Sequence, residues 1–258
     1  VGLVTNPSGV DRNLVSTVDI LHNAPGVELV ALYGPEHGVR GDIHAGDKVE
    51  GNVDPKTGII VHSLYGKTQK PTMEMLEGLD AIIYDIQDIG CRSFTFISTM
   101  GKVMEAAAEK GIEVIVLDRP NPLGGEKVEG PLVEEGFFSF VSQFAIPYVY
   151  GLTCGELALM LNQEGLLKDG VQCNLTVVPM EGWERYMIYE DTNLPWVLPS
   201  PHIPQPASSF YYPAVGIAGE LGAYSIGVGY TLPFQMLATE GVDADVLADR
   251  LNAKQLPG

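Results

Sequence analysis

The sequence predicts an α/β fold of the Rossmann-like type, in which helices cover both faces of a parallel sheet. Three observations support this class. Short runs rich in valine, isoleucine and leucine alternate with helical patterns through residues 1–120. The runs are almost continuously apolar, which is typical of strands covered on both faces. Strands separated by helices favour parallel pairing through right-handed crossovers.

The expected elements follow one another at short intervals. Strands are predicted at residues 1–5, 28–33, 59–64, 80–85, 112–118 and 174–179. Helices are predicted at 14–22, just after Thr72, at 95–110 before Gly111, from a capping box at Thr153 and Glu156, and at 243–252. The proline-rich stretch 196–206 is expected to be irregular, because proline has no backbone N–H to donate.

The composition changes after residue 118, where proline and glycine become frequent. We place a domain boundary near residue 150. Residues 1–150 then form a Rossmann-like domain that carries the catalytic loops, and residues 151–258 form a smaller α+β domain that closes the cleft. The chain opens directly on a core strand and carries no signal peptide. We therefore expect a fragment of a longer protein, with an incomplete second domain.

Charge and composition exclude several classes of function. The net charge of -18 argues against nucleic acid and anionic membranes as partners, because both would be repelled. No apolar run approaches the roughly 20 residues that span a bilayer. The three cysteines are far apart and form no CxxC pair, which argues against a disulfide framework and a structural zinc site.

Polar side chains follow four of the predicted strands, at the edge of the sheet where open α/β folds bind ligands. The set comprises Asn6, Glu36, His37, Arg40, Asp85, Gln87, Asp88, Arg92, Asp118, Arg119 and Asn121, with Glu129 downstream. Three of the chain's six arginines fall in these loops although the chain is acidic overall. We therefore expect one small-molecule site, in which the loops that hold Glu36, Asp88 and Arg119 surround a shared hollow.

Several members of this set also have a purely structural interpretation, as partners in local ion pairs. The pairs in question are Glu36–Arg40, Asp88–Arg92 and Asp118–Arg119. An acid beside a histidine in a Gly/Pro loop, such as Glu36, is enriched at functional sites without being diagnostic of one. The residues alone leave both interpretations open.

No nucleotide or nicotinamide cofactor is predicted. Gly66-Lys67-Thr68 resembles the end of a phosphate-binding loop, but Val61 holds the position of the upstream glycine. No GxGxxG follows the first strand. The stretch 222–227 has one residue too many for a nucleophile elbow.

A metal-dependent hydrolase is an alternative. Four residues that can ligate a divalent ion lie within eleven positions: His37, Asp42, His44 and Asp47. Their spacing matches no established metal motif. The sequence therefore favours a site without a metal.

A set of short motifs, spread over most of the chain, resembles the exo-β-N-acetylmuramidase family of bacterial glycoside hydrolases, long catalogued as proteins of unknown function. The motifs are Tyr33-Gly-Pro-Glu-His-Gly-Val-Arg-Gly41, Val53-Asp-Pro-Lys-Thr-Gly58, Ser63-Leu-Tyr-Gly-Lys-Thr68, Tyr84-Asp-Ile-Gln-Asp-Ile-Gly-Cys-Arg92, Leu117-Asp-Arg-Pro-Asn-Pro122, Tyr150-Gly-Leu-Thr153 and Pro199-Ser-Pro-His-Ile-Pro204.

The resemblance implies a function and a location. Such enzymes release N-acetylmuramic acid from the non-reducing end of peptidoglycan fragments, typically outside the cytoplasm, and their cleft lies between a Rossmann-like half and a smaller half. The acid of the family's Pro-Glu-His-Gly loop corresponds to Glu36. Family members often carry a Gly-Arg-Gly-Thr segment, and here Val228 replaces that arginine.

Glycoside cleavage needs a carboxylic acid that protonates the leaving oxygen and usually a second carboxylate. We expect Glu36 to be the acid, Asp88 the second carboxylate with Asp85 as alternate, and His37 to position Glu36 or the sugar. Either Arg40, Arg92 or Arg119 would bind the lactyl carboxylate of a muramic sugar. An exposed aromatic side chain such as Tyr65, Phe94 or Trp196 would stack on the ring, although core packing is the more common role of any one of them. A sugar-binding or anion-binding protein without turnover is the rival interpretation.

Overall fold

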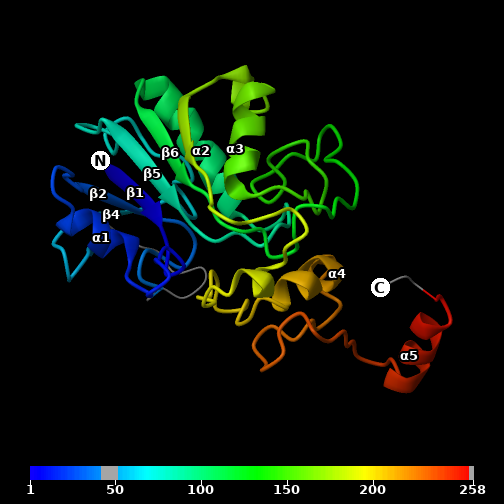
Figure 1. Cartoon of the computed structure of the whole chain (residues 1–258). Helices are drawn as coiled ribbons and strands as arrows, with labels where there is room; N and C mark the ends of the chain where they lie inside the picture. The colour runs from blue at the N-terminus through cyan, green and yellow to red at the C-terminus, as the bar shows by residue number, and fades with distance from the viewer. Residues whose placement is uncertain (42–51, 256–258) are drawn as a thin grey trace.

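The computed structural model describes residues 1–41 and 52–255, which form a seven-stranded sheet with the order β3-β4-β2-β1-β5-β6-β7 (Figure 1). The strands are β1 (Gly2–Thr5), β2 (Ala31–Gly34), β3 (Asn52–Val53), β4 (Ile60–Ser63), β5 (Ala81–Asp85), β6 (Glu113–Leu117) and β7 (Asn174–Val178). All neighbours pair in parallel except β3, a two-residue edge strand antiparallel to β4.

Without β3, the order of the six parallel strands is that of the doubly wound Rossmann sheet, so the predicted fold class is confirmed. The chain moves outward from β1 in one direction through β2 and β4, and then returns to add β5, β6 and β7 on the other side. The strand order therefore reverses between β1 and β5. At such a point the loops diverge to opposite faces and leave a crevice beyond the strand ends.

Helices cover both faces of the sheet, as predicted. The covering helices are α1 (Thr17–Asn23), α2 (Phe96–Lys110) and α3 (Cys154–Gln163). Helices α4 (Ser208–Glu220) and α5 (Ala244–Asn252) follow later in the chain. In Figure 1, α2 and α3 lie side by side on one face of the sheet and α1 lies on the other.

Two apolar cores follow from the alternation of side chains along the strands. Leu3 and Leu32 point toward α1, where they pack with Val18. Val4 and Tyr84 point the other way, into a larger core built from α2 and α3. Strands β1, β2 and β5 are therefore buried on both faces, which explains their continuous apolar runs in the sequence.

Some local predictions need correction. The helix expected at 14–22 begins only at Thr17, because Leu14 has a φ of 64°, outside the helical range. The segment after Thr72 forms turns rather than a helix. The sequence interpretation also missed β3, which has only two residues, and α4, which contains Pro213 in its interior.

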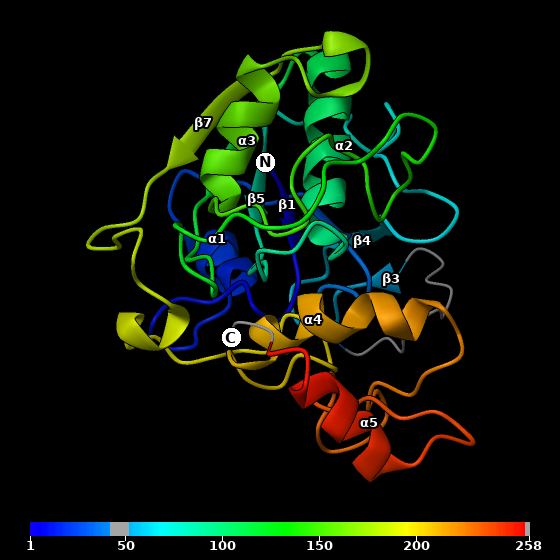
Figure 2. The same cartoon turned by 90° about the vertical axis from the view of Figure 1, so that its right-hand side faces the viewer.

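Residues after β6 belong partly to the sheet layer. Helix α3 packs on α2 and β7 extends the sheet beside β6, so both continue the Rossmann-like layer past residue 150. From there, irregular chain leads to α4. Figures 1 and 2 show α5 set apart from the sheet, on the far side of α4. The described residues after 207 contain the two helices α4 and α5 and a single β-bridge, Ser225–Ala238.

Within the described ranges, no helix combines the length and the apolar character that crossing a membrane requires.

A glycine in α2 makes a close packing contact possible. A Cβ added at Gly101 would lie 2.3 Å from Cζ of the buried Phe144. We predict that Gly101→Ala lowers the free energy of unfolding by about 1–3 kcal/mol, because overpacking outweighs the gain in helix propensity. Denaturant unfolding measures the difference.

The matched control is Gly216→Ala in α4, where the nearest atom to the added Cβ is the Tyr148 hydroxyl at 4.0 Å. This variant should equal or exceed the stability of the wild type by up to about 1 kcal/mol. Equal stability of Gly101→Ala and the wild type would show that Phe144 does not pack over the helix backbone.

Candidate functional site

Glu36 lies in a tight turn directly after β2. The backbone N–H of Gly38 donates to the carbonyl of Pro35 at 3.1 Å, and His37 has a φ of 74°. A positive φ at the third residue is a feature of type II turns, which usually place glycine there. The turn folds back on the strand end, since a Cβ on Gly34 would lie 3.0 Å from the Cα of Gly38. The backbone therefore holds Glu36 and His37 in a fixed, strained geometry.

The Glu36 side chain is half-buried and contacts a tyrosine from the next loop. Tyr65, which follows β4, hydrogen-bonds to the Glu36 carboxylate. Burial raises the pKa of the Tyr65 phenol, and the adjacent Glu36 charge and hydrogen bond raise it further. The phenol therefore stays protonated and acts as a donor to Glu36.

His37 points toward the proline-rich segment near residue 200. Its imidazole is 8% exposed, and its Nε2 lies 3.3 Å from the Ser200 hydroxyl. The adjacent carbonyl of Pro199 accepts a hydrogen bond at 2.9 Å from the amide of Asn6, which follows β1. The Asn6 amide oxygen in turn accepts from the Ser8 backbone N–H. Asn6 therefore holds the 199–200 segment against the turn of Glu36, with its own polar groups engaged.

Arg40 pairs with aspartates rather than with Glu36. Its Nε and Nη2 donate to the two carboxylate oxygens of Asp54 at 2.9 and 3.1 Å, and Nη2 also reaches Asp19 at 3.2 Å. The Arg40 hydrogen bonds hold the pKa of Asp54 at about 2, below its usual value. The predicted Glu36–Arg40 pair is therefore absent from the described contacts.

Asp88 is a buried carboxyl group. It is 4% exposed, its Oδ2 accepts from the Tyr150 hydroxyl and from the Gly90 N–H, and burial raises its pKa to about 7. Arg92, the partner expected at helical spacing, instead donates to the carbonyls of Pro131 and Ile146. Burial lowers the pKa of Arg92. The Asp88–Arg92 pair is therefore not formed.

Asp85 ends β5 at the point where the strand order reverses. Its carboxylate accepts from Arg119 Nε at 2.5 Å and from the Thr17 hydroxyl at 2.5 Å. The Arg119 guanidinium also donates to the carbonyl of Val10 at 2.9 Å. Burial alone would lower the pKa of Arg119, but the adjacent Asp85 more than offsets this and raises it.

Asp118 caps helix α3 rather than pairing with the Arg119 guanidinium. It accepts from the Gly155 N–H at 2.7 Å and from the Thr153 hydroxyl at 2.8 Å, at the positive end of the helix dipole. Burial raises the pKa of Asp118. The capping box predicted at Thr153 and Glu156 is confirmed.

Three other predicted site residues make mostly structural contacts. The Asn121 amide donates to the carbonyl of Leu152, and the Gln87 amide donates to the carbonyls of Asp88 and Pro120. Glu129 lies on the surface, where Lys127 is 3.6 Å away and the Glu129 side chain is 64% exposed.

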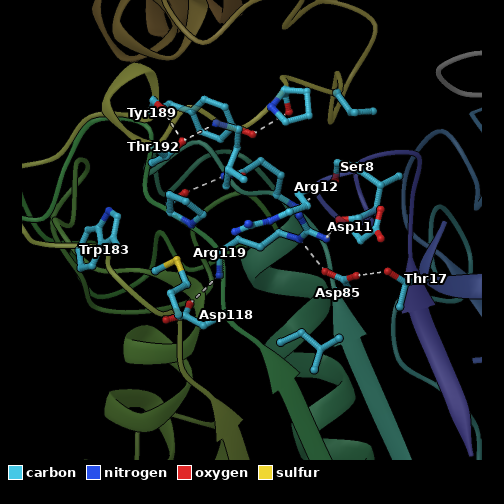
Figure 3. A pocket seen from close by; sticks show the side chains of 18 of the residues that line it. Ser8, Asp11, Arg12, Thr17, Asp85, Asp118, Arg119, Trp183, Tyr189 and Thr192 are labelled. Atoms are coloured by element: carbon cyan, nitrogen blue, oxygen red, sulfur yellow. Dashed lines mark hydrogen bonds and ion pairs between the residues drawn. The ribbon is translucent and has the colours of Figure 1, made fainter. Parts of the chain in front are cut away.

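A cavity of about 550 Å³ opens beyond the carboxyl ends of β1, β5 and β6, at the reversal of strand order (Figure 3). It is lined by four predicted site residues, Asp85, Gln87, Asp118 and Arg119. Glu36, His37 and Asp88 do not line it. The expected single hollow around Glu36, Asp88 and Arg119 is therefore not this cavity, because only Arg119 of the three lines it.

The metal alternative involves residues that the structure does not describe. Asp42, His44 and Asp47 lie outside the described residues, and only His37 of the proposed ligand set is described. In the parts that are described, no cluster of three or more histidine, cysteine or acidic side chains has the geometry of a metal site.

Comparison with known proteins identifies the family. A sequence profile for the N-terminal part of the exo-beta-N-acetylmuramidase NamZ matches residues 1–207, and one for its C-terminal part matches residues 210–258. This chain belongs to the NamZ family. The resemblance expected from the short motifs is therefore confirmed.

Known relatives agree with this membership. The chain is 50% identical over its whole length to the peptidoglycan beta-N-acetylmuramidase NamZ of Bacillus subtilis (strain 168). Two crystal structures of DUF1343 family proteins from Bacteroides fragilis NCTC 9343 superpose with TM-scores of 0.93 and 0.78, at 65% and 34% identity, over 100% and 92% of this chain. The chain spans 61% of the Bacillus protein and 65% and 61% of the crystallised chains.

Several contact residues of the site escaped the sequence interpretation. In the sequence, Ser200 stands out only as part of a motif, and Tyr65 as part of a motif and as a stacking aromatic. Tyr150, which donates to Asp88, was not singled out as a site residue. Ser200 and His37 are 163 positions apart, so no local pattern indicates their contact.

The Arg40–Asp54 pair gives a pH-dependent prediction. The pKa of Asp54 is lower in the folded protein than in the unfolded chain, so its contribution to stability is present above about pH 4 and is lost as the pH falls toward 2. We predict that Asp54→Asn lowers the free energy of unfolding by about 2 kcal/mol at pH 7. This difference should shrink steadily below pH 4.

The control is Asp80→Asn, which removes an exposed carboxylate at the start of β5. It should change stability little at either pH. A loss from Asp54→Asn that stays constant between pH 7 and pH 3 would mean that the ion pair is not its source.

Proposed function

We propose that this chain is the catalytic part of an exo-β-N-acetylmuramidase. It releases N-acetylmuramic acid from the non-reducing end of peptidoglycan fragments, and Glu36 is the general acid. Membership of the NamZ family and the activity named for the Bacillus relative support the reaction class. The observation that supports the role of Glu36 is its half-buried carboxyl group, held in a strained turn beside Tyr65 and His37.

A general acid needs to approach the leaving oxygen and to have access to solvent protons. Among the predicted carboxyl groups of the site, Glu36 is more exposed than Asp85 and Asp88, which are 1% and 4% exposed. Asp85 is committed to an ion pair with Arg119, and Asp118 to a helix cap. Glu36 is therefore the carboxyl group best placed to protonate a glycosidic oxygen.

The second carboxylate stays a prediction, with Asp88 and Asp85 as candidates. Asp88 is partly protonated near neutral pH because burial raises its pKa to about 7, and a nucleophile needs the charged form. Asp85 would have to leave both Arg119 and Thr17 to reach a sugar. The contacts of Asp88 and of Asp85 indicate that each carboxylate also stabilises the structure, whether or not it takes part in catalysis.

Recognition of the lactyl carboxylate by Arg40, Arg92 or Arg119 also stays a prediction. Arg40 shares the loop of Glu36 and its side chain is 27% exposed, which favours it among the three. We also propose an extracytoplasmic location, since peptidoglycan lies outside the cytoplasm. Cell fractionation with an antibody against the chain tests the location.

Replacement of Glu36 tests the general acid. Glu36→Gln should lower kcat on a glycan with an N-acetylmuramic acid end by about 10²–10⁴-fold, because the amide cannot deliver a proton. The kcat of Glu36→Gln on a chromogenic aryl β-N-acetylmuramide should fall much less, because the aryl leaving group departs without protonation. Parallel assays of both substrates measure the two losses.

The control is Glu77→Gln on the surface, which should match the wild type. The β-N-acetylglucosaminide counterpart of the aryl substrate tests the choice of sugar. Equal losses on glycan and aryl substrate would reassign Glu36 to binding or structure. Full activity of Glu36→Gln would identify another acid, and binding of the glycan without turnover by the wild type would indicate a receptor.

Tyr65 is expected to position Glu36. Tyr65→Phe removes the hydroxyl that donates to the Glu36 carboxylate. We predict a fall in kcat on the glycan of up to about tenfold, with KM nearly constant and a changed pH–rate profile, because one hydrogen bond to the acid is lost. A higher KM at constant kcat would instead assign Tyr65 to the stacking role.

A further inference from the structure

The cavity at the reversal of strand order is separate from the proposed acid. Asn6 and Ser8 are two residues apart, yet Asn6 binds the segment beside His37 while Ser8 lines the cavity. Glu36 and Tyr65 are not among its lining residues. The group of Glu36, Tyr65 and His37 proposed for the acid step therefore lies outside this cavity.

The cavity has the size and composition of a small-molecule site. Its volume of about 550 Å³ lies within the roughly 300–1,000 Å³ typical of ligand pockets. Apolar side chains of Ile20, Leu21, Met187 and Leu194 form part of its wall. It also occupies the crevice where doubly wound sheets bind their ligands.

The charges of the wall have both signs. Two arginines and five carboxylates line the cavity, which makes the wall acidic overall. Four of the carboxylates accept hydrogen bonds from the protein: Asp11, Asp85, Asp118 and Asp191. The fifth, Glu181, is exposed and makes no hydrogen bond or salt bridge within the described residues.

Arg12 is the available cation of this wall. Arg119 is held by Asp85 and Val10, whereas the Arg12 side chain is exposed and has no hydrogen bond or salt bridge to the part of the chain that the structure describes. Both arginines extend into the cavity in Figure 3. The Arg12 charge also interacts with the carboxylate of the adjacent Asp11.

A phosphate or other polyanion would meet an acidic wall, and a simple cation would leave Arg12 unused. A ligand with one carboxylate and one ammonium group uses both available charges, and its aliphatic atoms match the apolar wall. We propose that this cavity binds a zwitterionic amino acid or short peptide, with its carboxylate on Arg12 and its ammonium group on Glu181.

Such a peptide has two possible sources. It can be free, or it can remain attached to a glycan through its amino end. Attachment converts the terminal ammonium into a neutral amide, so the contact with Glu181 is lost. The proposal therefore favours the free peptide, and this choice does not depend on the glycosidase reaction.

Calorimetric titration of the chain tests the proposal with four probes: the dipeptide Ala-Leu, its N-acetyl form, its C-terminal amide, and N-acetylmuramyl-Ala-Leu. We expect saturable binding of Ala-Leu and a loss of about tenfold or more for each of the other three, since each lacks one charged contact. The substitutions Arg12→Gln and Glu181→Gln should each lower the affinity for Ala-Leu by a similar factor. N-acetylation should weaken binding to Glu181→Gln no further.

Arg250→Gln, in the distant helix α5, is the control and should bind Ala-Leu like the wild type. Absence of saturable binding, or equal binding of all four probes, would overturn the proposal. Binding of the muramyl peptide alone would assign the cavity to the glycan site instead. Hydrolysis of the aryl muramide is measured with the same preparations, and Arg12→Gln should be as active as the wild type. This assay distinguishes failure of peptide binding from failure of the proposed glycosidase reaction.

Discussion

The carboxylate of Asp85 joins the parts of the molecule that meet where the strand order reverses. It ends β5, accepts from Thr17 at the start of α1 and pairs with Arg119 after β6, while its own carbonyl accepts from Thr5 at the end of β1. With a side chain 2% exposed, it is a buried charge, and loss of its partner would leave it uncompensated. The edge of the sheet that carries both ligand regions depends on this ion pair.

Two kinds of polar residue can be distinguished along this edge. Asp85, Asn6 and Asn121 are buried and Asp118 is half-buried, and protein donors or acceptors occupy their polar atoms. Such groups hold loops, because exchanging those partners for a ligand gains little. Glu36 retains exposure in a backbone that the protein strains to maintain. The Glu36 carboxylate therefore still has atoms free to bind a ligand, whereas the polar atoms of the other four residues are engaged within the protein. This difference, rather than charge or position alone, distinguishes the candidate catalytic group from the residues that hold the loops.

The strands of the parallel sheet could be predicted from the sequence, whereas the side-chain contacts at the edge of the sheet could not. The strand predicted at 80–85 and the helix predicted at 95–110 are β5 and α2 to within a residue at each end, because apolar period and glycine capping are local signals. The arginine pairs were predicted between neighbours in sequence, yet Arg119 binds Asp85 and Arg40 binds Asp54. Loop conformation decides such pairs, and sequence spacing does not encode it.

One sheet edge can carry two ligand regions because its loops diverge. The turn after β2 carries Glu36 toward the segment at 199–200, whereas the loops after β5 and β6 bring Asp85 and Arg119 around the cavity. Asn6 and Ser8, in the loop after β1, face these two regions respectively. A displacement of this loop would alter both regions at once. The short loop after β1 therefore contacts both ligand regions and fixes their separation along the sheet edge.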